Sequence, residues 1–223
     1  MATRAKPHWD ADSPELRRNL HKVSASIQRD AEKRVTPKVA TAKAWQKVIM
    51  TDLAVPQPLY AGHFRGEPGL ERCGVCVRDG GNTYPGANPW HVADELKAFQ
   101  IKLQRTVARL DAKYPDDDSL DDDGMSAVID LAAWAHAHWI RIHPFANGNG
   151  RTARVWANLL LMRYGLPPVV TLRPRPGGGY SAAGVAAMRG DWQATRRVLR
   201  NMVLSAVANA PAVVLARKTN PPE

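Results

Sequence analysis

The chain has 223 residues, of which 44% are hydrophobic and 23% are charged, as in ordinary globular proteins. This length favours one domain with a short extension over two domains. The only two cysteines, Cys73 and Cys76, exclude a disulfide scaffold and fit a reducing compartment. The N-terminus lacks the apolar core of a signal peptide, and no apolar run reaches the roughly 18 residues of a membrane span. We therefore expect a soluble, cytoplasmic protein with no membrane partner.

The net charge is +10, from 31 Lys and Arg against 21 Asp and Glu, and residues 151–223 alone carry 11 basic and 2 acidic groups. A nucleic acid would explain such an excess, and so would a smaller phosphorylated ligand. Charge alone does not choose between them. For the basic helices at the N-terminus, a solvated helical face is the simpler interpretation, so we do not expect nucleic acid as a partner.

Two helices are predicted at the start of the chain. Ser13 is a suitable N-cap and Pro14 suits the first turn of a helix over residues 13–34. Thr36-Pro37 begins a second helix that continues to about Met50. We treat residues 1–54 as a basic N-terminal helical extension.

The remainder of the chain is also mostly helical. A β-hairpin is predicted at 73–84, within a segment rich in Gly and Pro, with its turn at Asp79-Gly80-Gly81. Helices are predicted at 92–113, 125–142, 150–164, 181–188 and about 191–208, before a polar tail. The predicted fold class is therefore mainly α, with one short β-hairpin.

Residues 143–154 are the segment most informative about function. They form a glycine-rich loop that opens directly into a helix, and Gly148 and Gly150 allow backbone N–H groups to face one anion at the helix N-terminus. Arg151 and Arg154 project from the first turn, and His143 can accept a proton near neutral pH. The segment predicts a phosphate site beside a base, which suits transfer of a phosphorus-containing group to a hydroxyl.

Two other phosphate-binding patterns fit this segment less well. A P-loop requires Gly-Lys-Ser/Thr, whereas Arg151-Thr152 follows the glycines here. A dinucleotide-binding pattern requires a preceding strand, whereas the run from Val128 to Ala135 is rich in alanine and has helical spacing.

The same segment resembles the signature of the Fic family, His-x-Phe-x-Asp/Glu-Gly-Asn-Gly-Arg-x-x-Arg, and departs from it only at Asn147. Weaker similarity extends over about residues 55–205: Gly62-His63-Phe64-Arg65 resembles the start of the family pattern, and the hairpin at 73–84 falls where the family has its target-binding flap. The resemblance implies a Fic-type helical bundle with a flap, followed over 206–223 by a helix end and a tail.

The resemblance also implies an activity, namely transfer of a nucleotide monophosphate, most often AMP from ATP, to a Ser, Thr or Tyr hydroxyl of a target protein. His143 would be the general base, and Phe145 would anchor the loop in the core. The target would dock on the flap. The phosphates would be held by Gly148, Asn149 and Gly150, with Arg151 at the β-phosphate and Arg154 at the γ-phosphate.

Asn147 stands where the family has a carboxylate that binds Mg²⁺. An amide oxygen is still a possible Mg²⁺ ligand, but it carries no formal charge, so we expect weakened binding of the ion. Three outcomes stay open: weak AMP transfer, transfer of another nucleotide or phosphate group by the same site, or a catalytically silent module that binds a nucleotide or a partner.

Many members of the family restrain themselves with a helix that presents a glutamate to the second arginine of the signature. No glutamate of this chain lies in such a context. The protein is therefore either constitutively competent or inhibited by a separate antitoxin-like partner, which would make it the toxin half of a pair.

Three other features have ordinary interpretations. Cys73 and Cys76 are two thiols on the hairpin rather than half of a zinc site. The acidic residues at 116–124 form a solvated loop rather than a calcium site. His136 and His138 are packed helix residues rather than ligands.

Overall fold

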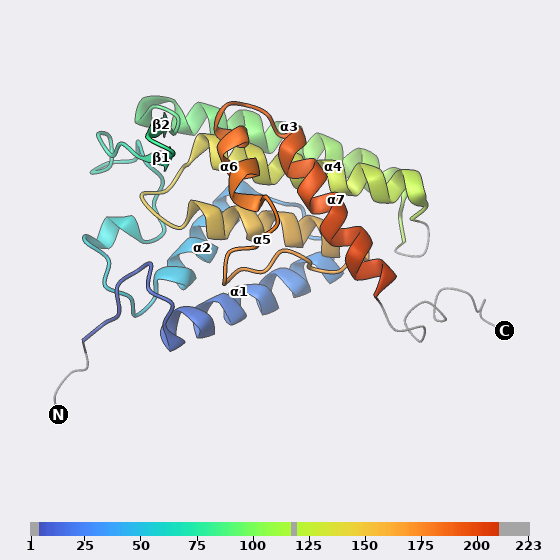
Figure 1. Cartoon of the computed structure of the whole chain (residues 1–223), viewed down its shortest axis with the longest axis horizontal. Coiled ribbons are helices and arrows are strands. Elements are labelled where there is room, and N and C mark those ends of the chain that lie inside the picture. Colours follow the sequence, from blue (N-terminus) through green and yellow to red (C-terminus); the bar gives the residue numbers. More distant parts are fainter. Residues whose placement is uncertain (1–4, 117–119, 210–223) are drawn as a thin grey trace.

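In a computed structural model, residues 5–116 and 120–209 are described, and they form a helical bundle with one hairpin (Figure 1). The predicted fold class, mainly α with a short β-hairpin, is confirmed. The α-helices are α1 (Pro14–Glu32), α2 (Val39–Met50), α3 (Val92–Lys113), α4 (Asp122–Ile142), α5 (Asn149–Met162), α6 (Tyr180–Met188) and α7 (Gln193–Ala208). Short 3₁₀ turns cover Pro58–Tyr60 and Pro89–His91, and the strands are β1 (Cys76–Asp79) and β2 (Asn82–Pro85).

Helix α5 lies in the middle of the bundle. It packs against α4 on one side and α1 on the other, and α6 and α7 close the α4 side (Figure 1). Its residues from Arg151 to Leu161 are all buried, which a helix tolerates only when neighbours surround it. The residues predicted to bind phosphate lie at the N-terminal end of α5, so the surrounding helices hold the candidate site in place.

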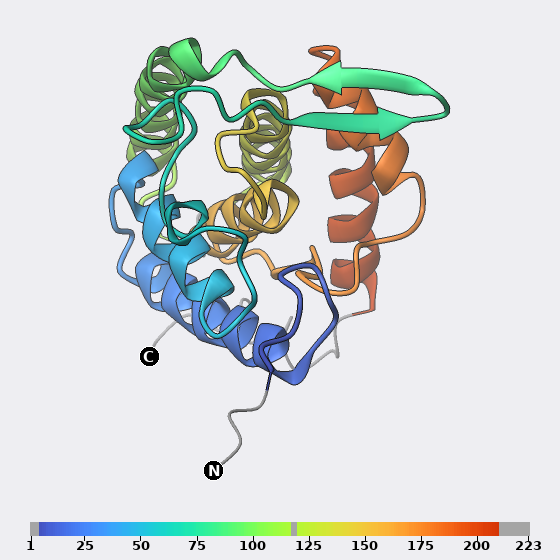
Figure 2. The ribbon, with the colours of Figure 1, turned by 90° about the vertical axis from the view of Figure 1, so that its left-hand side faces the viewer.

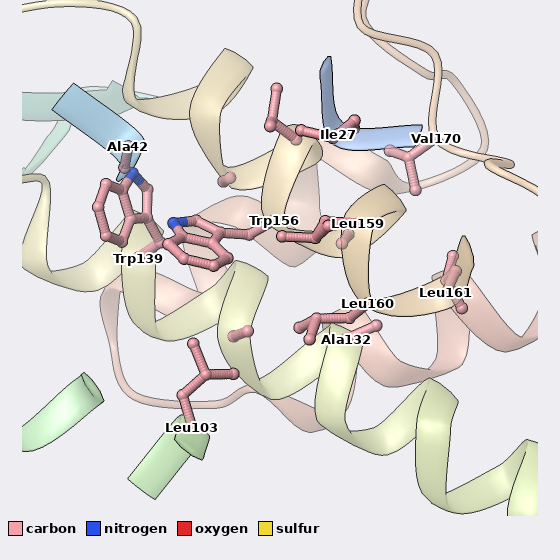
Figure 3. Packing of buried hydrophobic residues seen from close by; sticks show 14 of the residues in the cluster. Ile27, Ala42, Leu103, Ala132, Trp139, Trp156, Leu159, Leu160, Leu161 and Val170 are labelled. Carbon is pink, nitrogen blue, oxygen red and sulfur yellow. The ribbon is translucent and has the colours of Figure 1, made fainter. Parts of the chain in front are cut away.

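Aromatic side chains fill the core next to the predicted site. Trp139 of α4 and Trp156 of α5 are both fully buried, with ring centroids 5.7 Å apart (Figure 3). The Trp139 indole N–H donates a 2.7 Å hydrogen bond to the hydroxyl of Thr152. This contact ties the last turns of α4 to the first turn of α5, on either side of the loop that the sequence singles out.

The helix boundaries differ from the predicted ones by a few residues. Helix α4 begins at Asp122 rather than at 125, because the Asp121 carboxylate caps it by accepting from the Gly124 N–H at 2.6 Å. Helix α1 begins as predicted, since the Ser13 hydroxyl accepts from the Leu16 N–H at 3.2 Å. Helix α2 begins at Val39, two residues after the proline predicted to start it.

The hairpin extends beside α6, away from the main bundle (Figure 2). Its two strands pair antiparallel from Cys76–Pro85 to Asp79–Asn82, and Gly80 and Gly81 make the turn with positive φ angles, as the Asp-Gly-Gly sequence predicts. Arg189, just after α6, donates a 3.3 Å hydrogen bond to the Tyr84 hydroxyl and lies over its ring. This contact fixes the hairpin against the bundle.

The N-terminal helices share the core of the bundle. The buried face of α1, including Leu16 and Ile27, packs against α2 and α5.

Within the described residues, no helix is both long and apolar enough to cross a membrane. The predicted polar tail from Lys218 onward lies outside the described residues.

Candidate nucleotide-phosphate site

The predicted loop connects the C-terminus of α4 to the N-terminus of α5. His143 ends α4 in the left-handed conformation, with φ of 53°. Gly148, with φ of 86°, precedes the first turn of α5. A methyl group at Gly148 would lie 3.0 Å from the Cε of Met50, so both the backbone conformation and the neighbouring side chain favour glycine. The loop therefore connects His143 directly to the N-terminus of a buried helix.

The imidazole of His143 is oriented by the backbone of its own helix. Its Nδ1 lies 2.9 Å from the carbonyl oxygen of Ile140, and because a carbonyl only accepts, the proton is on Nδ1. Burial lowers the pKa of His143, a nearby Arg65 cation lowers it further, and the Ile140 carbonyl opposes both. The side chain is therefore neutral at pH 7, with the lone pair of Nε2 available to accept a proton.

Arg65 holds this loop in place, a role that the sequence does not reveal. It is 2% exposed, and its guanidinium donates to backbone carbonyls from three segments. Its Nε donates to the His143 carbonyl at 2.7 Å, and its backbone N–H donates to the Pro144 carbonyl at 2.7 Å. Its remaining donors reach the carbonyls of Cys73, Ala87 and Ile142. Arg65 thus joins the end of α4 to both ends of the hairpin.

Phe145 and Asn149 make the loop rigid. Phe145 is fully buried against Phe64 and Trp139, in the position predicted for a core anchor. The side chain of Asn149 bridges the backbone of Phe145, accepting from its N–H and donating to its carbonyl, both at 2.8 Å. The Asn149 side chain is consequently committed to the loop, and what it can offer a phosphate is its backbone N–H at the helix N-terminus.

Arg151 and Arg154 both fold back over the loop glycines. A methyl group at Gly150 would lie 3.4 Å from one terminal nitrogen of Arg154, and one at Gly148 would lie 3.9 Å from a terminal nitrogen of Arg151. Arg151 is 5% exposed and Arg154 is 4% exposed. The structure therefore brings the two predicted arginines together at the N-terminus of α5.

The two guanidinium groups have different surroundings. Arg154 donates to the Leu172 carbonyl at 2.8 Å and contacts the Tyr180 hydroxyl, while its buried Nε has no hydrogen-bond partner. Burial lowers the pKa of Arg151 to about 10, Asp10 opposes this shift, and Arg154 adds to it by charge repulsion. Because the two buried cations repel each other, an anion beside them would stabilise both.

In this structure the anion beside Arg151 belongs to the chain itself. Residues 7–12, which we call the N-terminal strap, run past the first turn of α5. Arg151 donates to the Trp9 carbonyl and to the Asp10 carboxylate, each at 3.0 Å. The amide of Asn147 donates to the other oxygen of Asp10 at 2.9 Å. Sequence patterns do not predict these contacts, because Asp10 lies 141 positions before Arg151.

The surroundings of Asn147 do not fit a resident metal ion. Its Oδ1 already accepts hydrogen bonds from the Gly148 N–H and from Arg151 at 3.1 Å. Over residues 5–116 and 120–209, no group of three or more His, Cys, Asp or Glu side chains could hold a metal ion. The nearest carboxylate, that of Asp10, is paired with Arg151.

The hairpin comes close to His143 where it rejoins the bundle. A methyl group at Gly86 would lie 2.7 Å from the Cβ of His143, so any side chain there would displace the loop or the hairpin. Next to this contact is an open pocket of about 270 Å³, lined by the end of the hairpin, by Arg141 and Ile142 at the end of α4, and by Met188 and Arg189. The pocket therefore lies at the end of α4, beside the residue that precedes His143.

The other features noted in the sequence lie elsewhere. Cys73 and Cys76 are free thiols at the start of the hairpin. His136 is buried and bonded through Nε2 to the Tyr180 hydroxyl, and His138 contacts Trp134, so both are packed helix residues as predicted. In the acidic segment, residues 117–119 lie outside the described residues, and Asp121 serves as the cap of α4.

The sequence matches the Fic/DOC family over residues 41–161, which is more than half of the chain. The chain belongs to the Fic/DOC family. The matched range contains the loop, both arginines and Arg65, but it begins after the N-terminal strap.

Curated relatives of this Fic/DOC protein are similar over a short segment. Protein adenylyltransferase fic-1 of Caenorhabditis briggsae is 49% identical over 55 residues, which are 24% of this chain and 11% of that protein. Protein adenylyltransferase Fic of Drosophila persimilis is 55% identical over 42 residues, which are 19% of this chain and 8% of that protein. The alignments span about a tenth of the length of these relatives.

Solved structures show that the bundle is a Fic fold. A Fic-domain signaling protein from Bacteroides thetaiotaomicron aligns with a TM-score of 0.54 and 20% identity, covering 88% of this chain and 73% of that one. A Fic-1 structure from Caenorhabditis elegans aligns with a TM-score of 0.57 and 21% identity, covering 93% of this chain and 53% of that one.

Proposed function

We propose that this Fic/DOC protein is a protein nucleotidyltransferase that transfers AMP from ATP to a Ser, Thr or Tyr hydroxyl of a target protein. The observation that carries the proposal is the junction of α4 and α5, where a short rigid loop connects a neutral imidazole at the end of α4 to two buried arginines near the N-terminus of α5. The curated relatives named protein adenylyltransferase support the same activity.

Each group at the junction has a role in this reaction. The Nε2 of His143 accepts the proton of the target hydroxyl, whose oxygen then attacks the α-phosphorus, and pyrophosphate leaves. The backbone N–H groups of Gly148, Asn149 and Gly150 bind phosphate oxygens at the helix N-terminus. Arg151 and Arg154 bind the β- and γ-phosphates and stabilise the charge on the leaving group.

Magnesium enters this proposal with the nucleotide rather than as a resident ion. The side-chain oxygen of Asn147 and the carboxylate of Asp10 both already accept from Arg151, so neither is free to bind Mg²⁺. An Mg²⁺ ion bound to ATP would neutralise phosphate charge and be held mainly by phosphate oxygens, and Asn147 would become a ligand only after its contacts with Arg151 and Asp10 open. We propose no step that depends on the ion.

The target is proposed to dock on the hairpin. In a two-stranded sheet each strand has one unpaired edge, so an extended target segment can add to it by main-chain hydrogen bonds. The pocket between the hairpin and α6 then admits the target side chain towards His143.

The proposal is tested with ATP labelled at either the α- or the γ-phosphate, incubated with cell lysate. We expect label from the α-position in target protein and none from the γ-position, because the group transferred is AMP. His143→Ala removes the base and should lower labelling at least 100-fold. His91→Ala changes an exposed histidine in a 3₁₀ turn away from the loop and should label as the wild type does. Label from the γ-position, or labelling unchanged in His143→Ala, would refute the proposal.

A second candidate is a catalytically silent module that binds nucleotide or a partner. The pairing of Arg151 with Asp10 and the uncharged Asn147 favour it, since both reduce the capacity of the site for a metal–nucleotide complex. Binding of ATP without transfer of label, in wild type and in His143→Ala alike, would select this candidate.

The toxin half of a toxin–antitoxin pair is the biological role we propose for an active enzyme. Induced expression of the wild-type chain should then arrest growth of the host cell, whereas His143→Ala should not. Co-expression of a separate inhibitory partner would relieve the arrest. Equal growth with both chains would argue against a toxin.

A further inference from the structure

The N-terminal strap is anchored on a segment far from it in the sequence. The Ala54 N–H donates to the Pro7 carbonyl at 2.7 Å, and His8 pairs with Ala54 as an isolated parallel bridge. The ring of Trp9 stacks on Tyr60, with centroids 5.6 Å apart and planes 16° from parallel. These contacts place the next residue, Asp10, over the first turn of α5.

At that position the strap takes up the hydrogen-bond donors of Arg151. One terminal nitrogen of the guanidinium donates to the Trp9 carbonyl at 3.0 Å, and the other donates to Asp10 at 3.0 Å and to Asn147 at 3.1 Å. A phosphate held by Arg151 would need the same N–H groups. The Asp10 carboxylate and a phosphate are therefore alternatives for one cation.

Asn147 is suited to this contact because its amide donates. Its Nδ2 gives a 2.9 Å hydrogen bond to the carboxylate of Asp10. A carboxylate at position 147 would have no proton to donate and would repel Asp10 at the same distance. The uncharged residue in the loop and the acidic residue in the strap are thus matched to each other.

The strap nevertheless lies at the surface, so it can detach from Arg151 without disturbing the core. The side chain of Asp10 is 57% exposed, whereas that of Arg151 is 5% exposed. Arg173 holds the Asp10 backbone carbonyl at 3.1 Å, and both of these residues lie at the surface. Opening the strap would uncover a buried cation, a cost that a bound phosphate would offset.

We propose that the N-terminal strap is a built-in competitor of the phosphate ligand, with Asp10 occupying on Arg151 the position of a phosphate group and Asn147 securing it there. This inference rests on the proposed function, because it takes the loop as a nucleotide-phosphate site. The strap and the ligand exclude each other from Arg151, so the apparent affinity for the ligand is set by how often the strap is open.

The strap is tested first without any ligand. Hydrogen exchange at the Ala54 amide, which donates to Pro7, reports whether the strap is closed. We expect Asp10→Asn to accelerate this exchange, since it removes the charge that pairs with Arg151. Asp12→Asn is the matched control, because Asp12 lies two residues away and pairs with Arg17 at 2.8 Å. Equal exchange in Asp10→Asn and wild type would overturn the proposal.

The competition is tested next by equilibrium binding of ATP and of inorganic tripolyphosphate, both in EDTA so that no metal ion contributes. Asp10→Asn should bind each probe about ten-fold more tightly than wild type, the factor expected if the strap is closed about 90% of the time. Asn147→Ala, which removes the donor to Asp10 without adding a charge, should also tighten binding, and should lose this effect when combined with Asp10→Asn. The Asp12→Asn control should bind as wild type does.

The outcomes separate the two proposals. Tighter tripolyphosphate binding in Asp10→Asn, without ATP binding by any variant in EDTA or with Mg²⁺, would support the strap as a phosphate competitor and refute the nucleotidyltransferase. Weaker binding of both probes in Asp10→Asn would overturn the strap proposal, because Asp10 would then assist the ligand instead of excluding it. Affinity unchanged by Asp10→Asn would overturn it as well.

Discussion

The conformation of His143 is imposed by its neighbours. A left-handed φ of 53° is unfavourable for a histidine, and the Ile140 carbonyl and the Arg65 guanidinium hold the residue in it. The contact with Ile140 also decides its chemistry, since it fixes the proton on Nδ1 and leaves the lone pair on Nε2. Under the proposed function, the motif in the sequence indicates which residue is the base, and this contact indicates which nitrogen would act.

The pH dependence of transfer follows from the lowered pKa of His143. The base must be neutral to accept a proton. Because the pKa of His143 lies below 6.5, its neutral form dominates at pH 7 and above. The rate should therefore be constant from pH 7 to 8.5 and should fall only in acid, with a midpoint below 6.5. Initial rates of labelling against pH measure this. A midpoint above 7 would contradict the assignment of a buried, neutral base.

Arg65 should affect transfer without touching the nucleotide. Arg65→Lys keeps the charge but loses the planar set of donors that reaches several carbonyls. We expect about 3 kcal/mol lower stability and a transfer rate reduced about ten-fold. Denaturant unfolding and labelling rates check the two effects. Wild-type values for both would show that the loop keeps its shape without this residue.

At the scale of elements, the site depends on how α4 is joined to α5. The two helices flank a loop whose ends are fixed by the Trp139–Thr152 hydrogen bond and by the burial of Phe145. The N-terminus of α5 is a suitable anion site because these contacts prevent the loop from relaxing.

The contribution of the Trp139–Thr152 contact can be measured with a double-mutant cycle. Thr152→Val leaves the buried indole N–H without its partner and should lower the free energy of unfolding by about 2 kcal/mol. Trp139→Phe removes both the N–H and packing volume. The double variant should be more stable than the sum of the single effects predicts, because it contains no unpaired indole N–H. Strictly additive effects in denaturant unfolding would contradict a direct contact.

Much of the element pattern could be predicted from sequence, because its signals are local. Ser13 caps α1, two glycines turn the hairpin, and the glycine-rich loop opens a helix, each within a few residues of the expected place. The contacts of Arg65 and Asp10 could not be predicted, because they join residues 78 and 141 positions apart and leave no spacing pattern. The use of the Asn149 side chain inside the loop could not be predicted either, and it leaves the backbone N–H of Asn149 for a phosphate, as the glycine-rich pattern predicts.

At the scale of the whole molecule, the N-terminal helices and the signature loop form one unit. Residues 1–54 are separable in the sequence by composition, yet α1 packs against α5 and the strap reaches Arg151. Stability and ligand binding are therefore linked through the same helix.

Acid should destabilise the fold through His136. Burial lowers its pKa from 6.5 to about 3, with the Arg154 cation adding to the shift. Between about pH 3 and 6.5, His136 is protonated in the unfolded chain and neutral in the folded chain. The contribution of His136 to the free energy of unfolding is therefore fully present above pH 6.5 and is lost as the pH decreases. The slope from this residue is roughly 1.4 kcal/mol per pH unit.

Urea unfolding between pH 7 and 5 measures this dependence. His136→Gln retains a hydrogen-bonding group for the Tyr180 hydroxyl but does not titrate, so its stability should change less over this range. The same slope in the variant and in wild type would show that other groups control the acid sensitivity.

The most direct test of the site is to measure ATP binding and AMP transfer side by side in His143→Ala. If the loop and the N-terminus of α5 bind the phosphates while His143 acts only as the base, the variant should bind ATP with wild-type affinity and transfer no AMP. Retained transfer in this variant, or loss of ATP binding together with transfer, would contradict that division of roles.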